Sequence, residues 1–315
     1  MIVSVSRRTD IPAFYSNWFF NRLKEGFVDV PNPFNDKQIS RITLSPDTVD
    51  CFVFWTKDAT PMLSRLDELS GYNYYFQYTV TPYGKDVELN VKNKKNILET
   101  FKKLSNKIGS NKVILRYDPI FTNETYTKEY HVRAFENLCS KLKGYTEKCV
   151  ISFIDYYKKT ERNTKSLHIL KMSEEDINFI CENFSNIAEK YNIKIETCSE
   201  KYNLEKYGIT HGKCVDNNLI SDILGFEIDI EKDPYQREEC GCVKSIDIGE
   251  YNTCLHNCLY CYANFNYDQV RIKSNLHNPL SSLLTGELKD DMKINVRQMP
   301  KLKKLIKPIK QQSLF

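Results

Sequence analysis

The chain has 315 residues, of which 41% are hydrophobic, so it is long enough for one large domain or two small ones with a sizeable core. It has no run of about 18 apolar residues and no signal-peptide pattern at its N-terminus, which argues against a membrane span and leads us to expect a cytoplasmic protein. The net charge of +4 is too small to identify a partner, and eleven cysteines in such a protein indicate metal binding, catalysis or core packing rather than disulfides.

Short apolar runs alternate with longer stretches of helical apolar spacing through residue 198. The predicted strands cover residues 2–6, 51–55, 74–80, 112–117, 149–154 and 193–198. The predicted helices cover residues 14–24, 61–69, 92–104, 128–142 and 173–191. Gly26 is expected to end the first helix, Ser173 to cap the last one, and Pro31 and Pro33 to lie in a loop.

The repeated strand–helix rhythm is typical of right-handed βαβ units around a parallel sheet. Six such units, with no dinucleotide-binding glycine pattern after the first strand, favour a full or partial (β/α) TIM-type barrel over a doubly wound sheet. We therefore predict an α/β fold with one barrel-like domain over residues 1–290. This domain includes a cysteine-rich, cluster-binding segment over residues 198–264, and a basic flexible tail covers residues 291–315.

Polar and charged residues gather just after the predicted strands. Because the active sites of barrels lie at the carboxyl ends of the strands, we expect these residues at one rim. The basic ones could bind carboxylate or phosphate groups, and the acidic ones could orient hydroxyls or amines. The alternative is that some of them only cap helices or pair with each other. The candidate catalytic residues are Arg7, Arg8, Asp10, Lys57, Arg116, Asp118, Asp155 and Glu200, with Thr81 beside them.

The segment YNTCLHNCLYCYAN, residues 251–264, holds Cys254, Cys258 and Cys261 in the spacing C-x3-C-x2-C. Three thiolates on a short loop suit a [4Fe–4S] cluster and leave one iron open to an exchangeable small molecule. The alternative is part of a zinc site, which would need a fourth ligand. His256 lies within the motif but is too close to its neighbours to close a tetrahedron easily, and Tyr260 is a candidate cofactor-binding residue.

A second set of thiols is less regularly spaced. Together these cysteines could bind another iron–sulfur cluster or structural zinc, because four thiolates suit both. A redox-active C-x-C pair and inert buried cysteines are the alternatives. The four cysteines of this set are Cys198, Cys214, Cys240 and Cys242. The others lie on predicted strands and helices and are expected in the core: Cys51, Cys139, Cys149 and Cys181.

The C-terminal residues suggest a partner. After Asp291 the chain carries only basic charges, which would be attracted to polyanions. The last five residues, QQSLF (Gln311–Phe315), resemble the peptide by which bacterial DNA polymerases and repair proteins dock on the sliding clamp. Leu314 and Phe315 would be apolar anchors for a preformed pocket. The resemblance implies DNA and the sliding clamp as partners; the alternatives are a solvated end or one that folds back on its own domain.

Four stretches are similar to the uncharacterised bacterial family catalogued as domain of unknown function 1848: SRRTDIPAFYSNWFFNRL, LSPDTVDCFVFWTK, YYFQYTVTPYG and QREECGCVKSIDIGEYNTCLHNCLYCYAN. The cysteine motif, with Tyr260 before its last cysteine, resembles that of radical S-adenosylmethionine (SAM) enzymes. This resemblance implies a [4Fe–4S] cluster on Cys254, Cys258 and Cys261, and SAM as a second cofactor. It also implies an electron donor such as flavodoxin or ferredoxin, and radical chemistry on an unknown substrate that the tail would link to nucleic acid.

The chain departs from that enzyme pattern in two respects. The motif follows the last predicted units rather than the first strand, and no Gly-Gly-Glu segment is present for the SAM amino group. Since the last strand of a closed barrel lies beside the first, a late loop can still reach the same mouth. The competing hypothesis is a non-catalytic, metal-stabilised, nucleic-acid-associated protein that docks through its tail. A zinc hydrolase is disfavoured because the five histidines are scattered.

Overall fold

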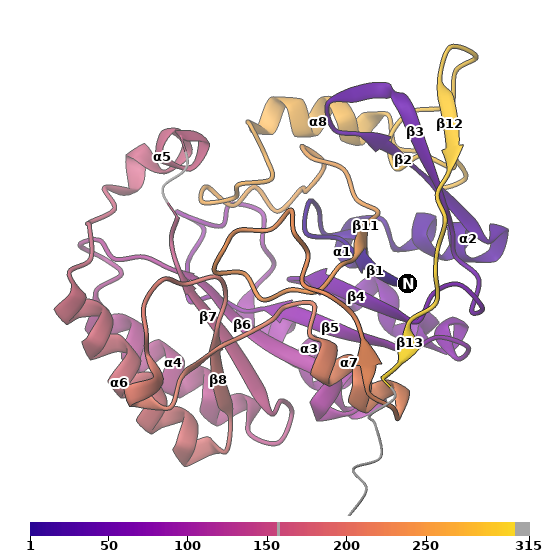
Figure 1. Cartoon of the computed structure of the whole chain (residues 1–315). Helices are drawn as coiled ribbons and strands as arrows, with labels where there is room; N and C mark the ends of the chain where they lie inside the picture. The colour runs from indigo at the N-terminus through magenta and orange to yellow at the C-terminus, as the bar shows by residue number, and fades with distance from the viewer. Residues whose placement is uncertain (156–157, 306–315) are drawn as a thin grey trace, which may run out of the picture.

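The computed structural model describes residues 1–155 and 158–305. Within these residues the centre is an eight-stranded parallel sheet in the order β11-β1-β4-β5-β6-β7-β8-β9 (Figure 1). The strands are β1 (Ile2–Val5), β4 (Cys51–Thr56), β5 (Tyr74–Thr79), β6 (Val113–Ile120), β7 (Lys148–Phe153), β8 (Lys194–Thr197), β9 (Thr210–His211) and β11 (Ile246–Asp247). The predicted parallel α/β arrangement is confirmed, and in the described chain no ladder joins β9 to β11.

The helices lie mostly where helical apolar spacing predicts them. They are α1 (Ile11–Phe14), α2 (Ser16–Glu25), α3 (Lys94–Ile108), α4 (Lys128–Leu142), α5 (Lys158–Thr164), α6 (Glu174–Tyr191), α7 (Asn217–Leu224) and α8 (Tyr267–Asn275). Helix α4 has the predicted bounds, and Ser173 caps α6 through a capping box with Asp176. The predicted first helix is divided at Tyr15, and Gly26 ends it in the left-handed conformation. Residues 60–69 form a 3-10 helix, η1 (Thr60–Leu69).

The two faces of the sheet have different partners. Alternate strand residues such as Phe52, Phe76 and Leu115 face the main core, which also holds the apolar sides of α2, α3, α4 and α6. The residues between them, such as Val53 and Tyr75, face a second core formed with residues 214–243. Figure 1 shows α3, α4 and α6 on one side of the sheet and the orange segment with α7 on the other. We call the second side the inner face.

Three pairings lie outside the predicted elements. Residues 27–43, predicted in part as a loop, form the hairpin β2 (Phe27–Asn32) and β3 (Asn35–Thr43), whose turn holds Pro33. Strand β12 (Lys293–Val296) pairs with β3, and β13 (Lys303–Lys304) pairs with β10 (Ile228–Asp229). The segment predicted as a flexible tail thus contributes two short strands, because backbone pairing at a sheet edge does not require an apolar pattern.

Two further predictions concern a docking peptide and membrane spans. The clamp-like peptide Gln311–Phe315 lies outside the described residues. In the described ranges, no helix is both long enough and apolar enough to cross a membrane.

Candidate functional site

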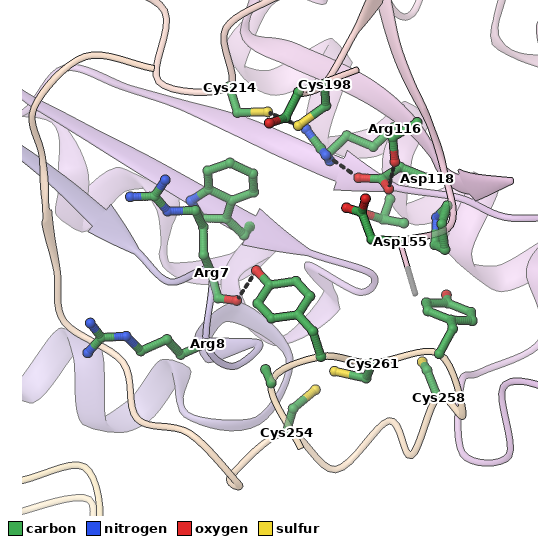
Figure 2. A pocket seen from close by; sticks show the side chains of 18 of the residues that line it. Arg7, Arg8, Arg116, Asp118, Asp155, Cys198, Cys214, Cys254, Cys258 and Cys261 are labelled. Carbon is green, nitrogen blue, oxygen red and sulfur yellow. Dashed lines mark hydrogen bonds and ion pairs between the residues drawn. The ribbon is translucent and has the colours of Figure 1, made fainter. Parts of the chain in front are cut away.

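A cavity of about 460 Å³ lies at the carboxyl edge of the sheet. Seven of the eleven cysteines line it, in two groups. Figure 2 shows Cys254, Cys258 and Cys261 on one side and Cys198 and Cys214 on the other, with charged side chains between them. Its volume is in the range of sites that enclose a small molecule. We refer to residues 251–264 as the three-cysteine loop and to Cys198, Cys214, Cys240 and Cys242 as the four-thiol group.

The three-cysteine loop reaches this cavity because β11 pairs with β1. The parallel pairing of Val3 with Ile246 and Ser4 with Asp247 places the end of the last strand beside the end of the first. The loop closes through a hydrogen bond of 3.1 Å from the Asn252 amide to the Ala263 carbonyl. Asn257, between the first two cysteines, has a φ of 52°, a conformation that asparagine adopts more readily than most residues.

The segment that follows β5 binds the three-cysteine loop and holds it in place. The Leu259 amide donates to the Val87 carbonyl at 3.0 Å, and Glu88 pairs with Cys258 in an antiparallel bridge. The buried Glu88 carboxylate accepts hydrogen bonds from Lys57 at 2.7 Å, from Thr81 at 2.6 Å, and from Tyr260 and Lys94. Sequence reasoning missed Glu88.

Neighbouring charges keep the Glu88 carboxyl group ionised. Burial alone would raise the pKa of Glu88, but Lys57 and Lys94 outweigh it and lower that pKa to about 2. Burial would likewise lower the pKa of Lys57, yet Glu88 raises it above its ordinary value. Lys57 and Tyr260, both predicted as site residues, therefore lie at the cavity as parts of one ion-paired network.

Asp10 anchors the other end of the loop. Its carboxylate accepts bonds from the Ala13 amide, which it caps, from the Thr56 hydroxyl and from the Lys57 amide. It also lies 2.8 Å from Nε2 of His256. His256 Nδ1 is buried at the cavity and has no hydrogen-bond partner within the described residues.

The wall between the two thiol groups is built by inner-face residues of β4 and β6. Trp55 has the Arg7 guanidinium at 5.8 Å and the Arg116 guanidinium at 5.3 Å from its ring centre. Arg116 pairs with Asp118, which also accepts a bond from Ser152. Asp118, predicted to follow the strand at 112–117, belongs to β6 like Arg116, and both share a face with Ile114 because side chains alternate along a strand.

Arg7 and Arg8 leave β1 together but have different partners. The Arg7 guanidinium donates to the Ser245 hydroxyl at 3.3 Å, and the Arg7 amide donates to the Asp247 carboxylate at 2.8 Å. The Arg8 guanidinium donates to the Gly249 carbonyl at 3.3 Å, and its Nε lies 3.9 Å from Oδ1 of Asp247. Asp247, a second residue that sequence reasoning missed, also accepts bonds from Ser4 and Ser6 and so joins β1 to β11.

Three other predicted residues differ in their position relative to the cavity. Asp155 lines the cavity and pairs with Arg237. Glu200 is buried behind the cavity, where its carboxylate accepts a bond of 2.7 Å from the Phe153 amide, and burial raises its pKa to about 7. Thr81 donates to Glu88 and does not line the cavity. The remaining predicted site residues do line it: Arg7, Arg8, Asp10, Lys57, Arg116, Asp118, Tyr260 and the seven cysteines.

The four-thiol group is a chain of sulfur contacts. Cys198 Sγ lies 3.2 Å from Cys214 Sγ, and the Cys242 thiol hydrogen-bonds to both Cys214 and Cys240. The bond with Cys242 lowers the pKa of Cys240 to about 7, although burial opposes it. Cys51, Cys139, Cys149 and Cys181 are buried elsewhere, as predicted for core cysteines.

The thiols of the three-cysteine loop border the cavity but are enclosed by protein, and burial raises the pKa of Cys254, Cys258 and Cys261 above the ordinary value. Burial outweighs the nearby charge of Lys57 in setting the pKa of Cys258 and Cys261. Among the described residues, no three or more His, Cys, Asp or Glu side chains are arranged to hold a single metal ion. A multinuclear cluster distributes its ligands over several metal atoms, so its thiolates lie further apart than those around one ion.

Comparisons with known proteins identify a family but no activity. A family model described as "Domain of unknown function (DUF1848)" matches residues 2–263, from β1 through the three-cysteine loop. Neither a search of curated proteins nor a search of solved structures finds a significant match. The matched region contains both groups of cavity cysteines. The chain therefore belongs to the DUF1848 family, as its sequence resemblance predicts.

Proposed function

We propose that this protein is a radical SAM-type iron–sulfur enzyme whose reaction takes place in the cysteine-lined cavity. One observation carries the proposal: the three thiols of Cys254, Cys258 and Cys261 border one cavity at the carboxyl edge of a parallel sheet. In this proposal the sheet acts as a partial (β/α) barrel and the cavity is its mouth.

The donor set fits a cluster better than an isolated zinc ion. The three thiols are free of disulfides. Among the described residues, no three or more His, Cys, Asp or Glu side chains surround a single metal position. A structural zinc site is normally closed by four ligands, whereas a cluster on three thiolates retains an open iron. The unpartnered Nδ1 of His256 also supports a bound group in the cavity, because buried polar atoms are rarely left unsatisfied.

When bound, a [4Fe–4S] cluster on these thiolates supplies an open iron for SAM and the electron for its reductive cleavage to a carbon-centred radical. The protein's own residues position and enclose the reactants. The Glu88 network holds the loop, and Asp10 holds its histidine. An external donor such as flavodoxin or ferredoxin would provide the electron.

Arg7 is the best-placed residue for an anionic group of the substrate. Arg116 is already paired with Asp118, and its Nη1 donates to Cys214 and Gln77. The Arg7 side chain has a neutral hydroxyl as its hydrogen-bond acceptor and lies over Trp55 at the cavity. A guanidinium there can bind carboxylate or phosphate with two parallel hydrogen bonds while the indole supplies an apolar surface.

Single cysteine variants test the proposal. We expect Cys254→Ala, Cys258→Ala and Cys261→Ala each to abolish cleavage of SAM to methionine and 5′-deoxyadenosine by the reduced, reconstituted protein. Cys181→Ala, on α6 and away from the cavity, is the matched control and should retain cleavage. Undiminished cleavage in any of the three loop variants would overturn this assignment.

A further inference from the structure

The inner face of the sheet carries a second concentration of thiols that the proposed reaction does not use. Cys198 directly follows β8, Cys214 precedes α7, and Cys240 and Cys242 lie in the loop before β11. Residues 198 and 240 are far apart in the chain, yet all four side chains meet at one wall of the cavity. All four are free thiols, and Cys214, Cys240 and Cys242 are at least nine-tenths buried.

Packing alone would explain four small apolar side chains, but the donors around the sulfurs indicate more. Nη1 of the buried Arg116 lies 2.8 Å from Cys214 Sγ, and the Val215 amide donates to Cys242 Sγ at 3.4 Å. A neutral thiol is a weak acceptor, so a guanidinium directed at it is better matched to a thiolate. Hydrogen bonds to sulfur are also a usual means of tuning metal–thiolate centres.

The backbone at Cys214 and Cys198 is tied directly to strands of the sheet. The Cys214 carbonyl accepts bonds from the Tyr75 hydroxyl at 2.6 Å and the Gln77 amide at 2.9 Å, both on β5. The Cys198 amide continues the sheet by donating to the Ile151 carbonyl at 2.9 Å. A site on rigid elements meets the geometric demand of a metal centre better than a site on loops alone.

We propose that Cys198, Cys214, Cys240 and Cys242 form a second metal–thiolate centre, closed by four protein ligands, in the wall opposite the three-cysteine loop. Its ligand is a soft metal, either the iron of an iron–sulfur cluster or zinc. Each thiol that binds releases its proton to solvent. The sulfurs now touch in a chain rather than surround one point, so binding moves them apart. Cys198 is the least buried of the four.

The proposed second centre differs from the cluster proposed on the three-cysteine loop in its number of protein ligands. Four thiolates leave no open position, so this centre would stabilise the inner face or transfer electrons rather than bind a small molecule. Its position beside the cavity, with Arg116 and Asp118 between the two thiol groups, favours electron transfer if the metal is iron (Figure 2). This inference does not depend on the proposed function, since it concerns different ligands.

The test is a metal count on full-length variants purified anaerobically and reconstituted with iron and sulfide, or supplied with zinc. The triple variant Cys254→Ala, Cys258→Ala, Cys261→Ala should retain stoichiometric metal with sulfur coordination by X-ray absorption. Iron with sulfide would identify a cluster, and zinc with Zn–S distances of about 2.3 Å would identify a mononuclear site. Adding Cys198→Ala, Cys214→Ala, Cys240→Ala and Cys242→Ala to the triple variant should remove this remaining metal.

If the first variant folds but holds no stoichiometric iron or zinc, the inference is overturned. It is also overturned if the same metal remains after the four thiols are removed. Folding is checked by circular dichroism, and Cys181→Ala is the control. If either multiple variant does not fold, alkylation of the wild-type protein decides the question. Cys198, the least buried of the four, should resist a maleimide until a chelator removes the metal; equal labelling of Cys198 with and without the chelator would contradict a metal site.

Discussion

At the scale of single residues, Glu88 is the side chain on which the three-cysteine loop depends most. It is buried, accepts four side-chain hydrogen bonds and pairs with Cys258 through the backbone. We expect Glu88→Gln to lower the free energy of unfolding by about 3–5 kcal/mol, because it removes a buried counter-charge from the mostly buried Lys57 and the half-buried Lys94. Urea unfolding measures this, and iron retention should fall in parallel.

The control for Glu88 is an exposed glutamate on a neighbouring element. Glu99 on α3 is 58% exposed and has only a distant lysine contact of 3.8 Å. Glu99→Gln should change the unfolding free energy by less than about 0.5 kcal/mol. Equal stability of the two variants would mean that the Glu88 network does not hold the loop.

His131 gives a pH dependence that is independent of the cysteines. It is fully buried between Tyr117 and the Phe121 carbonyl, and burial lowers its pKa to about 4. The unfolded state therefore takes up a proton near pH 6.5 before the folded state does, and stability is lost as the pH falls from there toward 4. Between about pH 7.5 and pH 5 this amounts to about 2 kcal/mol.

His131→Asn should remove that part of the pH dependence of the unfolding free energy. The control is His168→Asn, at an exposed position with a φ of 46° that asparagine tolerates. Denaturant unfolding at both pH values is the measurement. The same pH slope in His131→Asn and in the wild type would contradict the assignment of a neutral, buried His131.

Single residues also show which parts of the cavity and its supports a local sequence pattern can indicate and which it cannot. Cys254, Cys258 and Cys261 are recognisable because their spacing is local, and Arg116 and Asp118 because they lie near the end of an apolar strand. Glu88 and Asp247 carry no local pattern, since their partners Lys57, Ser4 and Ser6 are distant in the chain. Such residues can be identified only when it is known which distant segments of the chain lie side by side.

At the scale of elements, the contact between β1 and the segment after β11 decides where the three-cysteine loop lies. Gly249 packs directly against the residues that follow β1, and an added Cβ would overlap the Ser6 side chain and lie 3.1 Å from Thr9 Cγ2. Its φ is not in the left-handed region, so space rather than backbone freedom requires glycine here.

We expect Gly249→Ala to lower the free energy of unfolding by about 1–3 kcal/mol, the usual cost of overpacking. It should also weaken cluster retention, because the loop begins two residues later. Gly71→Ala, whose Cβ would meet Pro46 at an ordinary 3.7 Å, is the control. Thermal unfolding and iron content measure both effects, and a variant as stable and as iron-rich as the control would contradict the packing argument.

The elements that the sequence predicts best are those with strong local signals. The capping box at Ser173 and the periodicity of residues 128–142 locate α6 and α4 closely. The hairpin of β2 and β3 was missed because Pro31 and Pro33 suggest a loop. The two-residue strands β9, β10, β11 and β13 are too short for any periodicity to appear.

At the scale of the whole molecule, the order of the sheet explains how two distant groups of cysteines share one cavity. The segment 214–243 covers the inner face, and β11 then returns the chain to the side of β1. The parallel sheet was predictable from its βα rhythm, whereas this covering segment has no such rhythm. Its role follows only from the tertiary packing of Cys214, Cys240 and Cys242 against the strands.

The measurement that tests the central claim most directly combines metal analysis with EPR spectroscopy of anaerobically purified protein, reduced with and without SAM. We predict iron and sulfide in stoichiometric amounts and a reduced-cluster signal whose shape changes when SAM is added. A centre closed by four thiolates would not respond, so the change reports the open iron at Cys254, Cys258 and Cys261. Stoichiometric zinc without iron, even after anaerobic reconstitution, would contradict the radical SAM proposal.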